Sequence, residues 1–229
     1  MAEETKPFVV TISRQLGSGG GFIGERLSAR LKAIYLDREI LRHAAEKLKV
    51  TEEELETLDE KNTPFWESIL LSSNYVTPTL YTPPVTMGVF PMDQDLFRVE
   101  KEIITRVAEK NTAIIVGRGG SYILRAHPRH ASLYLHADIS VRCERIQAIY
   151  KLPVAKALKM LQENDKTRSR YLHHVTGVDW SDARQYNLCI DTGMLELPKV
   201  ENLVIDYLQA RFGPLELTSI PNIETPDKR

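Results

Sequence analysis

The stretch from Phe8 to Gly24 constrains the fold of this chain more than any other, because it joins an apolar run, a glycine cluster and a helical repeat. Residues 8–12 are apolar and β-rich, which predicts a buried strand. Ile23, Leu27 and Leu31 then recur at helical spacing. Between them lie four glycines, Gly17, Gly19, Gly20 and Gly21. A glycine loop between a strand and a helix points backbone N–H groups at an anion, so the stretch predicts a phosphate-binding loop. The alternative is a tight turn without a ligand.

The glycine loop departs from the usual sequence pattern of a phosphate-binding loop. A P-loop ends in Gly-Lys-Ser/Thr, where the lysine binds phosphate and the hydroxyl binds magnesium. Here the triplet is Gly19-Gly20-Gly21, so both side chains are missing. The spacing Gly19-x-Gly21-x-x-Gly24 also satisfies a dinucleotide fingerprint, although Asp37 comes earlier than the expected ribose-binding acid. A nicotinamide-dependent dehydrogenase therefore stays as an alternative.

The rest of the chain alternates apolar runs with helical periodicity. Residues 33–36, 112–116, 133–135 and 188–190 predict further strands, and residues 94–110 and 198–212 predict amphipathic helices. This alternation predicts an α/β fold within a single domain of 229 residues. We expect a three-layer parallel sheet of about five strands with helices on both faces.

Three predicted strand ends carry candidate ligand-binding residues. Arg14 stands beside the glycines, Asp37 and Arg38 follow the second strand, and Arg118 lies in the turn Gly117-Arg118-Gly119. Ligands of parallel α/β folds bind at the carboxyl ends of the strands, so we expect these residues to converge. For Asp37 and Arg38, capping of the following helix is an equal alternative.

A second basic cluster lies between residues 165 and 174. Arg168 and Arg170 keep their charge at all relevant pH values and can fork onto phosphate oxygens. A solvated basic face is the alternative. His173 and His174 are adjacent, without a third ligand nearby, which predicts no metal site.

Composition and charge limit the classes of partner and the cellular location that we expect for this protein. The formal net charge of -1 favours neither nucleic acid nor an anionic membrane as a partner. Cys143 and Cys189 have no metal-ligand spacing, the N-terminus is polar, and no apolar run reaches the ~18 residues of a membrane span. We expect a soluble, cytoplasmic protein.

Two segments lie outside the predicted α/β core. Residues 62–93 are rich in proline and aromatic residues and predict an insertion that covers a site or forms a homodimer contact. Residues 213–229 predict a loosely held tail.

Several motifs together resemble a known family. They are Ser13-Arg14-Gln15-x-Gly17-Ser18-Gly19-Gly20, the strand-end Asp37, the turn Gly117-Arg118-Gly119-Gly120, the arginine pair and Tyr186-Asn187-Leu188-x-Ile190-Asp191-Thr192. From Phe8 to Phe212, outside the insertion, the chain is similar to the cytidylate kinase-like proteins, which are P-loop nucleoside monophosphate kinase relatives.

The resemblance implies a P-loop kinase-like fold with an arginine-bearing helical lid at residues 151–178. It implies transfer of the γ-phosphoryl group of ATP to CMP, dCMP or a similar small acceptor, with Mg²⁺. Arg14, Arg168 and Arg170 would be the catalytic cations, and Asp37, Arg38 and Arg118 would bind the acceptor. The ATP phosphates would be held by Ser13, Gly17, Ser18, Gly19, Gly20 and Gly21, with Ser13 or Ser18 as the candidate magnesium hydroxyl.

The departures from the family pattern define the second hypothesis. The loop lysine is absent, and the family's Gly-Arg-Asp turn has become Gly117-Arg118-Gly119, without its acid. Phosphoryl transfer depends on neutralising charge, so these losses favour a nucleotide-binding module without turnover, in which the insertion recruits a partner. Arg14 is the candidate replacement for the lysine in the kinase hypothesis.

Overall fold

A five-stranded parallel sheet forms the centre of the protein. The computed structural model describes residues 6–37, 41 and 94–220. The strands are β1 (Val9–Arg14), β2 (Ile34–Leu36), β3 (Ala113–Val116), β4 (His130–His136) and β5 (Leu188–Asp191). Their order in the sheet is β2-β3-β1-β4-β5, with every pair parallel.

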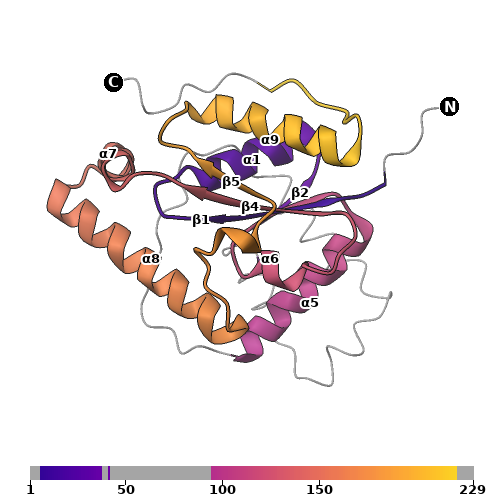
Figure 1. Cartoon of the computed structure of the whole chain (residues 1–229), viewed down its shortest axis with the longest axis horizontal. Coiled ribbons are helices and arrows are strands. Elements are labelled where there is room, and N and C mark those ends of the chain that lie inside the picture. The colour runs from indigo at the N-terminus through magenta and orange to yellow at the C-terminus, as the bar shows by residue number, and fades with distance from the viewer. Residues whose placement is uncertain (1–5, 38–40, 42–93, 221–229) are drawn as a thin grey trace.

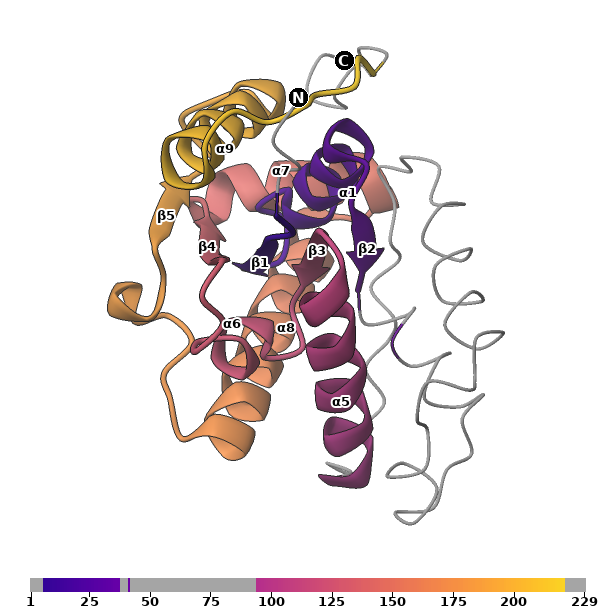
Figure 2. The same cartoon turned by 90° about the vertical axis from the view of Figure 1, so that its right-hand side faces the viewer.

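Helices cover both faces of this sheet. They are α1 (Gly20–Leu31), α5 (Gln94–Lys110), α6 (Gly120–Ile123), α7 (Ile139–Tyr150), α8 (Val154–Thr176) and α9 (Leu197–Phe212), with a short 3₁₀ turn at Ala183–Gln185. Helices α1 and α9 lie on one face, and α5, α6 and α8 lie on the other (Figure 1). The turned view in Figure 2 shows the same three layers. The predicted three-layer α/β fold is confirmed.

Alternation along the strands divides the core into two parts. Val10 and Ile12 of β1 pack with the helices α1 and α9, whereas Val9 belongs to a second cluster that includes apolar residues of α5. All four residues of β3 are buried, as the prediction of a strand covered on both faces requires. Burying one such aliphatic side chain stabilises the fold by about 1.5–3 kcal/mol, so these clusters hold the strand ends in place.

The fourth strand is longer than its predicted core of residues 133–135, because polar residues extend it in both directions. His130 Nε2 lies 2.8 Å from Thr11 Oγ1 on the neighbouring strand. Ser132 N–H donates to the Asn187 side chain over 2.9 Å, and Asn187 N–H donates back to the Ser132 hydroxyl over 3.0 Å. These cross-strand bonds satisfy polar groups that apolar periodicity does not register. The short helix α6 was not predicted either; it follows the turn at residues 117–120.

Some predictions concern residues beyond the described ranges. Arg38 and the insertion at 62–93, with its predicted homodimer contact, lie outside them, as do the last nine residues of the tail. In the described part of the tail, Thr218 N–H donates to the Arg30 carbonyl over 2.7 Å, and Leu215 packs on the core. Within the described residues, no helix is both long enough and apolar enough to cross a bilayer.

Candidate functional site

The glycine loop runs from the end of β1 to the first turn of α1 and requires its glycines. Gly17 and Gly19 both have φ of +80°, in the left-handed region that side chains disfavour. A Cβ on Gly17 would lie 3.0 Å from Cβ and the carbonyl of Arg142, and one on Gly19 would collide with Leu197. The loop therefore delivers its backbone to the N-terminus of α1, which is the geometry that binds anions.

The carbonyls of this loop are bound by side chains on its protein side. Arg145 Nη1 donates to the Gly17 carbonyl over 3.4 Å, and the Thr192 hydroxyl donates to the Ser18 carbonyl over 2.9 Å. Arg145 Nη2 in turn donates to the Thr192 carbonyl over 2.9 Å. Because a carbonyl oxygen repels an anion, holding these oxygens against α7 and the end of β5 favours phosphate at the loop.

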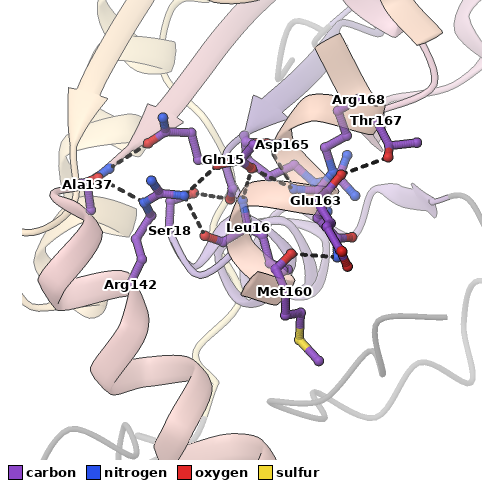
Figure 3. Close-up of polar contacts among 12 residues, drawn as sticks. Gln15, Leu16, Ser18, Ala137, Arg142, Met160, Glu163, Asp165, Thr167 and Arg168 are labelled. Atoms are coloured by element: carbon purple, nitrogen blue, oxygen red, sulfur yellow. Dashed lines mark hydrogen bonds and ion pairs between the residues drawn. The ribbon is translucent and has the colours of Figure 1, made fainter. Parts of the chain in front are cut away.

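Leu16 is held at both ends of its peptide. Its N–H donates to Asp165 Oδ1 over 2.9 Å, and its carbonyl accepts from Arg142 Nη1 over 3.3 Å. The same Arg142 Nη1 lies 2.6 Å from Asp165 Oδ2. Arg142 Nε is fixed by the Ala137 carbonyl at 3.0 Å. Figure 3 shows these four residues, through which α7 and α8 hold the start of the glycine loop.

Arg14 occupies the space that a side chain at Gly20 would need. A Cβ built on Gly20 would lie 2.7 Å from Arg14 Cγ and 2.8 Å from Arg14 Cβ. The guanidinium continues to Gly117, where a Cβ would collide with it. Arg14 thus passes from the N-terminus of α1 to the end of β3. A side chain at position 20 would therefore begin in the volume that the Arg14 stem fills.

Arg118 lies in a strained turn and is already engaged. Its φ is +54°, between Gly117 at +85° and Gly119 at +70°. Its Nε donates to Glu100 Oε2 over 2.7 Å, and its guanidinium stands 4.6 Å from the centre of the Tyr171 ring. Left-handed backbone at a non-glycine residue is costly and clusters at functional sites. In this structure Arg118 connects α5 with α8.

The two predicted lid arginines separate. Arg168 Nη1 donates to the Arg14 carbonyl over 3.3 Å and lies 3.9 Å from Asp165. Arg170 is exposed. Residues two apart on an α-helix point about 200° apart, so one helix cannot bring both side chains to the loop in this position. The structure brings Arg168 to the glycine loop and leaves Arg170 outside it.

Asp37 belongs to a buried group of ionisable side chains at the end of β2. Burial, followed by the charge of Asp37, raises the pKa of Glu25 to about 8. Burial also raises the pKa of Tyr35, with Asp37 and Glu25 adding to the effect and Arg14 opposing it. Glu25 Oε2 is buried and has no hydrogen-bond partner among the described residues. Asp37 itself is buried, and the charges of Asp37 and Arg14 both act on Tyr35.

The two candidate serines do not replace the magnesium-binding hydroxyl. Ser18 is fully buried and its hydroxyl donates to the Gln15 carbonyl over 2.9 Å. Ser13 hydrogen bonds with Tyr186, which opposes the rise that burial causes in the pKa of that tyrosine. Gly21 supplies no side chain. Across residues 6–37, 41 and 94–220, no three His, Cys, Asp or Glu side chains gather as a metal site. The loop therefore does not fit the magnesium position of a P-loop.

Sequence reasoning gave no role in the loop to the residues that hold it, which are Arg142, Arg145, Asp165 and Thr192. It also did not predict Glu100 as the partner of Arg118. One signal was available: Arg142 and Arg145 stand three residues apart on a helix and are both buried together with Ile146. Charged residues on the inward face of a helix need partners, and those partners come from segments far away in sequence.

Comparison with known proteins identifies the family of this chain. The model of the cytidylate kinase-like family matches residues 9–194. The cytidylate kinase of Sulfurisphaera tokodaii is 24% identical over 201 residues, which cover 87% of this chain and 94% of that enzyme. The cytidylate kinase of Methanopyrus kandleri is 24% identical over 217 residues, covering 90% and 94%. An uncharacterized protein from Eubacterium ventriosum has the same fold, with a TM-score of 0.67, 21% identity and coverage of 89% and 99%. The chain belongs to the cytidylate kinase-like family.

Proposed function

We propose that this protein is a kinase that transfers the γ-phosphoryl group of ATP to CMP, dCMP or a similar small acceptor. The observation that carries the proposal is that the stem of Arg14 fills the volume in which a side chain at position 20 would begin. A P-loop uses the lysine at that position to neutralise the transferring phosphate. Here an arginine that always keeps its charge lies along the same first turn of α1.

The glycine loop and the N-terminus of α1 would hold the ATP phosphates. Arg14 and Arg168 would neutralise the transferring group. The contact of Arg168 with the Arg14 carbonyl holds it at the end of β1, where the glycine loop begins. Arg170 lies away from the loop, so we assign it no contact with the phosphates in this arrangement. Positioning and neutralisation supply most of the rate enhancement in phosphoryl transfer, and a phosphate acceptor is already an anion, so the site needs no strong base.

Arg118 and Asp37 would bind the acceptor. Arg118 follows Gly117, which lies against the Arg14 guanidinium, in a turn of left-handed residues. It would leave Glu100 and Tyr171 to meet the acceptor phosphate. Asp37 is buried near Arg14 and would orient the acceptor by accepting hydrogen bonds from it. Magnesium would enter with ATP and neutralise part of the phosphate charge. We also propose that the protein acts in the cytoplasm, since Cys143 and Cys189 are both free thiols, as is usual in a reducing compartment.

A second candidate is a nucleotide-binding module without turnover. It is favoured by Gly20 and Gly21, which remove both the lysine and the hydroxyl of the P-loop. The two candidates differ in whether Arg14 performs the work of the lysine.

An ADP-release assay separates them. ATP and magnesium are supplied with CMP, dCMP, UMP, AMP or GMP. We expect turnover with one of the pyrimidine acceptors and a loss of at least about 100-fold in R14A, as for removal of a transition-state cation. R184A is the matched control, since Arg184 is exposed and pairs with Asp182; its rate should stay within about twofold. Absence of turnover with every acceptor, together with binding of an ATP analogue, would establish the module instead.

A further inference from the structure

One turn of α8 makes two separate contacts with residues 14–16, which lead from β1 into the glycine loop. Asp165 accepts from the Leu16 N–H at 2.9 Å, and Arg168 donates to the Arg14 carbonyl at 3.3 Å. Asp165 and Arg168 are three residues apart and therefore lie on the same face of the helix. In Figure 3 both side chains point toward the start of the glycine loop.

Asp165 has a fixed anchor of its own. Its second oxygen lies 2.6 Å from Arg142 Nη1, and Arg142 is tied through Nε to the Ala137 carbonyl. The Arg142 side chain is only 7% exposed and that of Asp165 19%, so water screens this pair weakly. The position of α8 relative to the loop is thus set by a short, charge-assisted link rather than by an exposed ion pair.

We propose that Asp165 is a positioning residue that docks α8 on the glycine loop and thereby places Arg168 beside the transferring phosphate. The inference rests on the proposed kinase function. Asp165 is an anion and does not itself neutralise the phosphate, so it acts on the reaction through Arg168.

The role needs a carboxylate. One Asp165 oxygen takes the Leu16 N–H while the other takes the Arg142 guanidinium. An asparagine has a single acceptor oxygen and a donating amide, so in D165N one of these two partners faces a donor. The helix then keeps its length and apolar packing but loses its register against the loop.

A double-mutant cycle tests this dependence. Steady-state rates are measured for the wild type, D165N, R168A and D165N/R168A with the best acceptor of the wild type. We expect kcat to fall about tenfold in D165N, with KM for ATP within about threefold. In the R168A background the same change should cost less than about twofold, because the residue that Asp165 positions is gone.

The control is E163Q, which removes a carboxylate from the same helix. Glu163 is well exposed and lies 3.8 Å from Lys159, so E163Q should stay within about twofold of the wild type. Thermal melting checks that each variant is folded. If D165N does not fold, D165E replaces it in the double-mutant cycle. D165E keeps the negative charge but displaces it by one methylene, so we expect the same changes in kcat and KM.

The outcomes separate the two proposals. A wild type with turnover, in which the D165N and R168A losses multiply, would overturn the positioning role and leave the kinase function standing. A wild type without turnover on any acceptor would overturn the kinase function and the positioning role with it.

Discussion

Arg14 and Gly20 occupy neighbouring space at the start of α1. The stem of Arg14 fills the place where a side chain at position 20 would begin, so the two positions depend on each other. Any side chain at position 20 has to displace the Arg14 stem, and any shorter residue at position 14 leaves a gap beside α1. The pair is therefore best tested as a pair.

Restoring the lysine alone should be harmful. We expect G20K to lower the free energy of unfolding by about 1–3 kcal/mol, because the new side chain overpacks against Arg14. The double variant R14G/G20K removes the clash and returns a cation to the loop, so it should recover part of the lost stability and of the ADP-release rate. Urea unfolding and the ADP-release assay measure the two effects. If G20K proved as stable as the wild type, the two side chains would not share this volume.

Glu25 should make stability depend on pH. Its pKa is raised from 4.5 to about 8, so between these values the folded protein keeps a proton that the unfolded chain releases. Stability therefore falls as pH rises from about 4.5 to about 8 and levels off above that. At 1.36 kcal/mol per pKa unit, the loss relative to E25Q reaches at most about 5 kcal/mol.

Urea unfolding of the wild type and E25Q at pH 5, 7 and 9 measures this difference. The two curves should nearly coincide at pH 5 and separate at pH 9, with E25Q the more stable. E144Q removes an exposed carboxylate from α7 and should follow the wild type throughout. Parallel behaviour of the wild type and E25Q would mean that Glu25 titrates normally.

Among the elements, those with one strong period were predictable and those held by polar contacts were not. The helix at 94–110 was predicted at its observed bounds, since its apolar face repeats without interruption. The start of β4 was missed because His130 and Ser132 are satisfied by Thr11 on β1 and by Asn187 just before β5, which a local pattern does not reveal.

The same limit applies to the candidate site. The glycine loop, Arg14 and Arg168 are visible as motifs, because each has a residue type suited to phosphate. Asp165 and Thr192 act through partners more than 100 residues away in sequence, Leu16 and Ser18, and no spacing rule connects them. Helix periodicity alone implies that the Arg168 and Arg170 side chains point in different directions.

At the scale of the whole molecule, α1 links the glycine loop to α9, its neighbour on the same face of the sheet (Figure 1). The glycine loop leads into the first turn of α1. Later turns carry Arg26 and Arg30, which both pair with Glu201 of α9. The Arg26 and Glu201 side chains are 5% and 1% exposed. A pair this deeply buried contributes little net stability when intact, but removing one partner leaves an uncompensated charge.

We therefore expect E201A to lower the free energy of unfolding by about 3–5 kcal/mol, which is the usual cost of breaking a buried pair. D206A is the matched control, because it removes an exposed carboxylate from the same helix and should cost less than about 0.5 kcal/mol. Urea unfolding measures both. Because Glu201 touches α1 and not the loop, the ADP-release rate per folded molecule should change by less than about threefold in E201A. A large loss of rate without loss of stability would mean that α9 acts on the loop directly, through the Leu197 side chain that lies against Gly19.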